Sequence, residues 1–316
     1  MKKTHLLAVL TLAATPFCLQ AQSTVSTPIV GFEKRNFVSG TTGHGVGFVL
    51  SSKFQGTASA VSSSSLSVSS SSFTANQFAP SGGLPTHYIQ ITSGSQSGLV
   101  VDIVGNTTAS LTVASGDLAS VSGTPNFVIR PHILASTLFK GNTSLADDSD
   151  TLTLFNSDGS TTTLAWSSTS STGWIDPNSL APVDAVIYPG QGFLLNTSGS
   201  GNFTANGVVN LSPTIVPLYA GKVNLVSLSN PSSAKNLQNI NLGANLEPEN
   251  DTIGTFSSDG YLSQDSAYTW NGSAGGGFVD PNSLVPANGV NVGGTSVIIV
   301  NSTFDTSWIQ PSPLTP

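Results

Sequence analysis

Acidic side chains gather just before two strand-like segments of this 316-residue sequence. Three precede each segment: Asp147, Asp148 and Asp150 in the first, and Glu247, Glu249 and Asp251 in the second. Calcium takes about six to eight oxygen ligands, mostly loop carboxylates and carbonyls, and extracellular calcium modules need only weak sites. The clusters therefore predict a weak calcium site, and calcium is the one cofactor that the sequence suggests. The alternative is that these acids are solvated loop ends, because no EF-hand pattern is present.

Aromatic side chains form a second candidate site. Trp166, Trp174, Trp270 and Tyr188 could stack on sugar rings, which would make the chain an extracellular glycan-binding protein with a polysaccharide as its partner. Aromatic residues also supply much of a protein core, about 150–250 Å² of buried area each. Trp166 and Trp270 occupy equivalent places in an internal repeat, described below, as core residues would. Core packing is therefore the favoured interpretation.

Residues suited to catalysis are sparse. After a predicted leader, histidine occurs only at His44, His87 and His132, and neither a Gly-x-Ser-x-Gly nor a His-Glu-x-x-His pattern is present. Glycoside hydrolysis needs two carboxyl groups about 5–9.5 Å apart. The only glutamates are Glu33, Glu247 and Glu249, and Asp176 or Asp280 would have to pair with one of them. The Asp-Pro-Asn sequences at these two positions are more simply interpreted as turns. We therefore predict no enzymatic activity, with polysaccharide hydrolysis as the less favoured alternative.

The elements that would position these residues are strands. Apolar and polar residues alternate with period two in short segments rich in Val, Ile and Thr, and Gly, Ser, Asn, Asp and Pro separate these segments. Clear examples are residues 87–91, 99–104, 110–113, 127–130 and 183–188. No window shows the 3.6-residue period of an amphipathic helix. The sequence therefore predicts an all-β fold.

The Ser-rich tract 57–75 has the composition of a flexible linker, but its apolar residues are spaced as in a strand, a turn and a second strand. Residues 102–113 repeat this design. Two hairpins of one type predict a small β-barrel in this part of the chain.

One segment of the chain recurs roughly a hundred residues later. Residues 150–159 match 251–260, residues 174–180 match 278–284, and Trp166 matches Trp270. Identity of this density predicts an internally duplicated module. Looser matches, of 27–32 with 213–218 and of 46–49 with 223–226, extend the duplication toward the amino terminus. The organisation expected from these matches is a signal peptide at 1–22, β-sandwich or barrel-like module A at 23–53 plus 131–212, the inserted barrel at 54–130, and module B at 213–316.

The first residues have the pattern of a secretory signal peptide. Lys2 and Lys3 precede an apolar run at 6–14, which is too short to span a membrane, and Ala21 offers a cleavage point. We therefore expect a secreted protein, extracellular or at the cell surface, with the periplasm as an alternative. Cys18 is the only cysteine, so the mature chain would contain none. No later segment is apolar for long enough to predict a transmembrane helix.

Charge is scarce in this sequence. Charged residues make up 8% against a usual value of about 25%, and the formal net charge is −7. An acidic chain of this kind is not expected to bind nucleic acid, because it has few cations to neutralise phosphates. Strand edges are usually protected by Lys or other charges. With so few of them, we expect edges to be covered, closed, or paired with another copy, which predicts self-association through strand edges.

These segments together resemble an uncharacterised family of secreted bacterial all-β proteins of similar length. The resemblance rests on a TPIVGF-like opening at 27–32, a VIRPH-like segment at 128–132, and two copies of a module running from Asp-Thr-Leu through Trp-x-Asp to Pro-Gly-x-Gly-Phe. The second copy departs from the pattern at 293–295. The resemblance implies the signal peptide and the duplicated module, and it carries no activity, cofactor or catalytic residue. The function predicted from the sequence is a secreted, non-enzymatic role that is structural, adhesive or in surface assembly.

Overall fold

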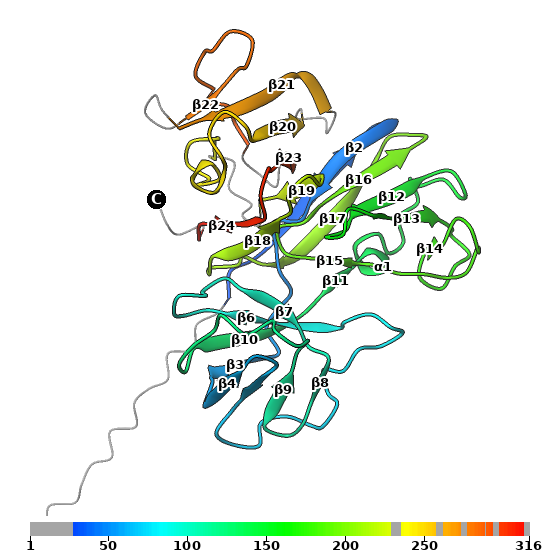
Figure 1. Cartoon of the computed structure of the whole chain (residues 1–316). Helices are drawn as coiled ribbons and strands as arrows, with labels where there is room; N and C mark the ends of the chain where they lie inside the picture. Colours follow the sequence, from blue (N-terminus) through cyan, green and yellow to red (C-terminus); the bar gives the residue numbers. More distant parts are fainter. Residues whose placement is uncertain are drawn as a thin grey trace, which may run out of the picture.

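In the structure, a computed structural model, nearly all of the regular secondary structure is β-strand, which confirms the predicted all-β fold class (Figure 1). It describes residues 28–228, 235–256, 262–272, 277–287, 289–292 and 297–312, and the predicted leader lies outside these ranges. Helical elements within them are the four-residue helix α1 (Ala135–Leu138) and the 3-10 turn η1 (Gly243–Asn245). No helix in the described ranges is long and apolar enough to cross a membrane.

The strands of module A enclose one core between two layers. They are β1 (Val30–Phe37), β2 (Gly40–Gly45), β11 (Ile133–Leu134), β12 (Thr151–Phe155), β13 (Thr161–Trp166), β14 (Trp174–Ile175), β15 (Val186–Ile187), β16 (Gly192–Thr197) and β17 (Gly201–Val208). One layer is a sheet of order β14-β13-β12-β16-β2, and the pairs β1-β17 and β11-β15 form the other. In β12, Leu152 and Leu154 are buried while Thr151 and Thr153 are only half-buried, which is the period-two pattern of a half-buried strand. Phe37, Trp174 and Phe203 fill the core from both layers.

Module B has its own core and its own pair of layers. Its strands are β18 (Thr214–Leu218), β19 (Asn224–Ser227), β20 (Thr252–Phe256), β21 (Leu262–Asn271), β22 (Gly277–Val279), β23 (Val297–Asn301) and β24 (Thr306–Gln310). The sheet order is β22-β21-β20-β23-β19, and β18 pairs with β24. Phe278, Ile298 and Trp308 are fully buried in this core.

The two five-stranded sheets have the same strand order. In chain order, β2 corresponds to β19, β12 to β20, β13 to β21, β14 to β22 and β16 to β23. The pairing register agrees as well, because Thr151 lies opposite Asn196 and Thr252 lies opposite Asn301. The pair β1-β17 likewise corresponds to β18-β24. A shared order and register are what the predicted duplication would produce.

The register corrects the looser sequence matches near the amino terminus. His44 lies opposite Phe193, and Val226 lies opposite the corresponding Ile298, so His44 is the equivalent of Val226. The sequence match had assigned Val49 to that place. Short apolar alternations look alike after a shift along the chain, so only strand pairing fixes the register.

The inserted segment folds around a third core. Its strands are β3 (Phe54–Thr57), β4 (Ala60–Ser62), β5 (Ser65–Ser67), β6 (His87–Ile91), β7 (Val100–Asp102), β8 (Gly105–Asn106), β9 (Ser110–Thr112) and β10 (Asn126–Pro131). They form sheets of order β3-β10-β6-β7 and β4-β5-β9-β8. The edge strand β3 leads directly into β4 and β7 leads directly into β8, so the chain joins the two sheets at both sides, as in a barrel. The Ser-rich tract forms the hairpin β4-β5 with Val61 opposite Leu66, which confirms the hairpin prediction over the linker.

The three cores draw their residues from the three predicted segments, and the boundaries at 53, 130 and 212 stay a prediction. In Figure 1 the barrel lies at one end of the molecule, below the two modules. It touches module B where the Ile215 N–H donates to the Gly98 carbonyl at 2.9 Å and Gln90 Nε2 donates to the Pro213 carbonyl at 3.0 Å.

Modules A and B contact each other through equivalent strands. β2 lies against β19, and the contact of β16 with β19 is matched by a contact of β2 with β23. Because β16 corresponds to β23 and β19 corresponds to β2, the β16-β19 contact and the β2-β23 contact are equivalent when the two modules are exchanged. The interface between the modules is therefore close to two-fold symmetric. Across this interface the Ser227 N–H donates to the Gly190 carbonyl at 2.8 Å, and the Ser227 hydroxyl donates to the Gln191 carbonyl at 3.0 Å. A Cβ on Gly43 would lie 2.7 Å from the Phe256 ring, so this close approach requires glycine.

Candidate functional site

The buried carboxylate of Asp150 ties together two loops of module A. Asp150 is fully buried. Its Oδ2 accepts a hydrogen bond from the Ala146 N–H at 2.9 Å, and its Oδ1 accepts one from the Ser198 N–H at 2.8 Å. The first donor lies in the turn before β12 and the second in the β16-β17 hairpin. Charge-assisted hydrogen bonds to backbone are strong, so this carboxylate stabilises the fold.

Asp251 does the same in module B. It is fully buried, and its Oδ2 accepts from the Glu247 N–H at 2.8 Å while its Oδ1 accepts from the Thr303 N–H at 2.8 Å. The Thr303 hydroxyl donates to the Glu247 carboxylate at 2.7 Å and contacts Asp251 Oδ1 at 2.8 Å. The aspartate that the two copies share at this position is thus explained by equivalent hydrogen bonds to two loop N–H groups in both modules.

The other acids of the predicted calcium site belong to the same turns. Asp147 is exposed and accepts from the Ser168 hydroxyl and N–H, both at 2.6 Å, and these bonds lower the pKa of Asp147. Asp148 and Glu249 adopt positive φ values of 61° and 68° at equivalent positions. Among the described residues, no group of three or more His, Cys, Asp or Glu side chains is arranged to hold a metal ion. The calcium site stays a prediction.

The tryptophans predicted to stack on sugar rings lie in or against the cores. Trp174 is fully buried and Trp166 is nearly fully buried. Their rings pack edge to face, with 5.2 Å between the ring centroids. Trp270 is half-buried and packs against Phe278 at 5.1 Å. Trp166 and Trp174 present no open ring face at the surface, which argues against the predicted platform and supports the core interpretation.

Tyr188 is different, because it lies at the junction of the barrel and module A. The residue is 37% exposed, and its hydroxyl donates to Asp102 Oδ2 at 2.7 Å. The other oxygen of Asp102 lies 3.0 Å from Nε2 of the buried His132. The centroid of the His132 ring lies 4.9 Å from that of the Tyr88 ring and 5.1 Å from that of the Tyr188 ring. Burial and the hydrogen bond to Asp102 raise the pKa of Tyr188, so its hydroxyl stays protonated as a donor.

Sequence reasoning singled out His132 and Tyr188 but missed Asp102 and Tyr88. The available signal was the charge of Asp102 within an otherwise apolar strand at 99–104. Nothing in the sequence connects that strand with residues 132 and 188, which meet it only through the tertiary fold.

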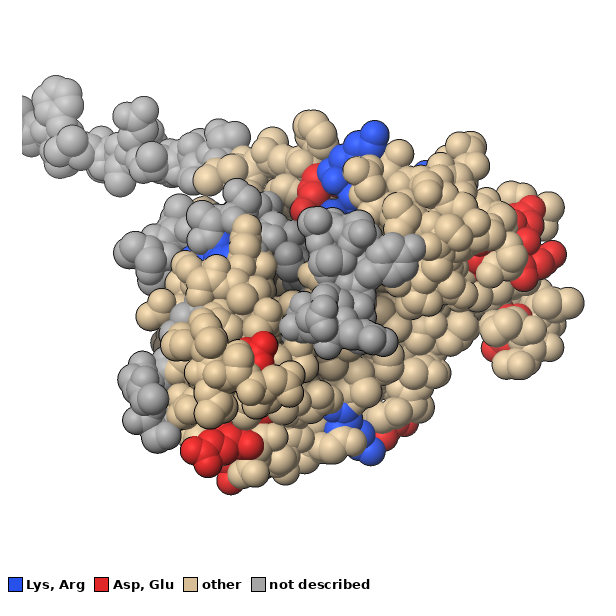
Figure 2. Space-filling view, turned by 90° about the horizontal axis from the view of Figure 1, so that it is seen from above, with Lys and Arg blue, Asp and Glu red and all other residues tan. Residues whose placement is uncertain are grey.

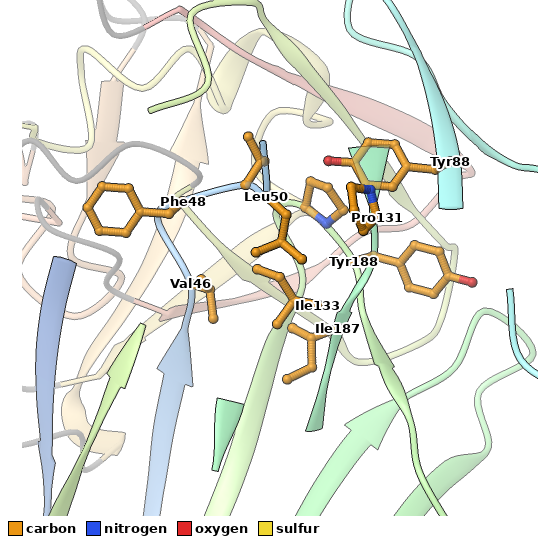
Figure 3. Close-up of a pocket in the computed structure, with 10 residues that line it drawn as sticks. Val46, Phe48, Leu50, Tyr88, Pro131, Ile133, Ile187 and Tyr188 are labelled. Atoms are coloured by element: carbon orange, nitrogen blue, oxygen red, sulfur yellow. The ribbon is translucent and has the colours of Figure 1, made fainter. Parts of the chain in front are cut away.

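A small apolar cavity lies beside this cluster (Figure 3). Val46, Leu50, Ile133 and Ile187 are among the residues that line it, together with both tyrosines. In Figure 3 the Tyr188 hydroxyl points away from these aliphatic side chains. The cavity volume is about 10 Å³, room for about one water molecule. A sugar ring does not fit inside this cavity.

The residues considered for hydrolysis have other partners. Glu33 forms an ion pair with Arg35 at 2.8 Å. Buried His44 lies 2.7 Å from the Thr42 hydroxyl, and burial, followed by the nearby charge of Arg35, lowers the pKa of His44 to about 3. His87 Nδ1 lies 2.9 Å from the hydroxyl of Thr86.

Asp176 and Asp280 each close a turn of the same geometry. Asp176 Oδ1 accepts from the N–H groups of Asn178 at 2.7 Å and Ser179 at 2.9 Å. Asp280 Oδ1 accepts from the corresponding N–H groups at 2.8 Å and 2.9 Å. These bonds lower the pKa of both carboxyls, which keeps them ionised and hydrogen-bonded at neutral pH. On the face that Figure 2 shows, acidic side chains lie in small separate groups.

Each turn ends on a leucine in a strained conformation. Leu180 has φ 57° and Leu284 has φ 56°, and each N–H donates to the Asp carbonyl four residues earlier at 2.8 Å. The left-handed region costs a non-glycine residue about 1–2 kcal/mol. Both side chains are nevertheless apolar and exposed, Leu180 by 67% and Leu284 by 71%. Strands β14 and β22, which lead into the turns, lie at opposite ends of the paired modules (Figure 1).

Comparisons with protein-family models, curated proteins and solved structures find no match to this chain. The two leucine turns, defined as residues 176–180 and 280–284, and the Tyr188 junction are therefore interpreted from their own geometry.

Proposed function

We propose that this chain is a secreted, non-enzymatic β-module protein with an adhesive or surface-assembly role, and that the two leucine turns are its contact points. The observation that carries the proposal is that both modules present the same exposed leucine in a conformation that glycine or asparagine would adopt at lower cost. Neither side chain adds to a core. Strained residues that the fold does not require are typical of binding loops.

Their placement supports bivalent attachment. Two like contact points at opposite ends of one chain can engage two sites at once, which raises the overall affinity without any new contact. The sequence adds a signal-peptide pattern and a surface with few charges. Asp150, Asp251 and Asp176 are engaged in structural hydrogen bonds, which fits a role without catalysis.

The test is retention of the labelled chain, without residues 1–22, on the surface of the cells that secrete it. The double variant Leu180→Gly with Leu284→Gly should be retained at least roughly tenfold less, since both contact points are lost. Leu211→Ala is the matched control, because Leu211 is exposed but lies outside the turns. Equal retention of the double variant and the parent would refute the proposal.

A glycan-binding role is the second candidate, and the partly exposed Tyr188 beside the Asp102 carboxylate favours it. Binding on a glycan array that Tyr188→Ala abolishes, and that the leucine variants keep, would support this candidate over the first. A polysaccharide hydrolase would instead show an activity that Asp176→Asn or Asp280→Asn removes.

A further inference from the structure

We propose that strand β1 pairs edge to edge with β1 of a second copy of this chain. This inference deepens the proposed surface-assembly role. It rests on that role in one respect, because attachment to a surface would bring many copies close together. Among the described residues, β1 pairs with β17 alone, so one of its edges is not used by the sheet.

The hydrogen-bonding groups at the outer edge of β1 follow from the pairing on its inner edge. The Val209 N–H donates to the Ile29 carbonyl at 2.9 Å, and Val208 bonds to Val49 on the opposite side of β17. Since antiparallel bonds alternate, the odd-numbered residues of β1 face β17. Val30, Phe32, Lys34 and Asn36 therefore direct their N–H and C=O groups to the outer edge.

The equivalent strand of module B shows how the same fold protects this edge. From the registers, Ile215 corresponds to Lys34 and Pro217 corresponds to Asn36. The Ile215 N–H is taken by the Gly98 carbonyl of the barrel, and proline has no N–H to offer. Within the part of the chain that the structure describes, strand β1 has neither device, and it is eight residues long against five in β18. A long strand with an open edge is a template for pairing with another chain.

The side chains of β1 suit a second copy of the same strand. Val30 and Phe32 are 70% and 75% exposed, an apolar pair without cover from the described residues. An antiparallel pairing centred on Lys34 places Glu33 opposite Arg35 of the other copy, twice by symmetry, and Phe32 opposite Asn36. Glu33 and Arg35 already form an ion pair within each copy, so the pairing brings two such ion pairs side by side with opposite charges facing each other across the strands. The exposed Lys34 side chains meet at the axis, where they can splay into solvent.

A pairing of this size is expected to be weak in dilute solution. Two eight-residue strands bury less than the roughly 1,200 Å² of a standard stable interface. Association should therefore depend on concentration and become important where copies are crowded on a surface.

The experiment is sedimentation of the chain without residues 1–22 over a range of concentrations. The parent should form a dimer as concentration rises. Asn36→Pro copies Pro217 of module B and removes two hydrogen bonds by symmetry, which should weaken the dimer by roughly tenfold or more. Asn36→Ser is the matched control and should dimerise like the parent, because it keeps the N–H.

A disulfide tests the register. The chain without residues 1–22 contains no cysteine. Residues directly opposite in a hydrogen-bonded antiparallel pair have Cα atoms about 5.5 Å apart, a separation that a disulfide spans. Lys34→Cys should therefore form a disulfide-linked dimer under mild oxidation. Thr204→Cys, on the neighbouring strand β17, should not.

A parent chain that stays monomeric at every concentration would overturn the inference, and so would equal dimerisation of Asn36→Pro and the parent. If circular dichroism shows that Asn36→Pro does not fold, Phe32→Asp replaces it, since an added edge charge also blocks pairing. The Leu180→Gly, Leu284→Gly variant keeps β1 and should dimerise normally. Failure of the leucine turns and failure of β1 pairing are therefore distinguishable.

Discussion

Replacing His44 with valine should remove an acid-sensitive contribution to the stability of module A. His44 is buried between Phe193 and Phe203, with ring centroids at 5.9 Å and 5.4 Å, and its pKa is lowered to about 3. In the unfolded chain the pKa returns to its ordinary value of 6.5. Below that value the unfolded state therefore binds a proton that the folded state does not. The contribution of His44 to stability is thus complete above pH 6.5 and is lost as pH falls toward 3.

The magnitude follows from proton linkage. Each pH unit in this interval lowers the free energy of unfolding by about 1.4 kcal/mol, which gives about 2.7 kcal/mol between pH 6.5 and 4.5. Valine is the residue that module B carries at the equivalent position, Val226, so the core is expected to accept it. The Thr42 hydroxyl keeps the Leu195 carbonyl as an acceptor at 3.2 Å.

The assay is urea unfolding followed by tryptophan fluorescence at a series of pH values from 7.5 to about 4.5, the interval over which linkage acts. Parent and His44→Val should have similar stability at pH 7.5 and diverge as pH falls, with the variant the more stable. His87→Gln is the control, because His87 is only half-buried and its replacement should change the slope less. Parallel curves for the parent and His44→Val would refute the assignment of a buried, neutral histidine.

Three further predictions concern the turns and the junction. Leu180→Gly and Leu284→Gly should each raise the free energy of unfolding by about 0.5–1 kcal/mol, because glycine accepts positive φ without strain, and urea unfolding would show a decrease if the strain is absent. Asp150→Ala and Asp251→Ala should each lower the free energy of unfolding by about 3 kcal/mol, since each leaves two loop N–H groups without their acceptor. A loss below about 1 kcal/mol would contradict the structural role of these two carboxylates. Tyr188→Phe should speed amide exchange of the backbone around Tyr88, where the barrel meets module A, and unchanged exchange would mean that the hydroxyl does not hold the junction.

Much of the module architecture could be predicted from sequence because its repeated residues have strong local roles. The Asp of each Asp-Thr strand and each Asp-Pro-Asn-Ser-Leu turn recur with the same hydrogen bonds, and period-two alternation identifies the strands. The match of β2 with β19 failed at the level of residues, because His44 and Val226 share a place in the fold but no chemical likeness. The contacts among Tyr188, Asp102 and His132 could not be predicted, since these residues are far apart in the sequence and meet only through long-range packing. Trp174 is fully buried in the core of module A, a placement that its residue type leaves open.

Agglutination is the measurement that tests bivalent attachment most directly. The Asn36→Pro chain, in which copies are not expected to pair through β1, is added to suspended cells of the kind that secrete the protein. With both leucine turns intact it should bridge cells and agglutinate them, whereas addition of either Leu180→Gly or Leu284→Gly should leave binding but abolish bridging. Agglutination that survives the loss of one turn, or that fails with both turns present, would contradict the proposed role.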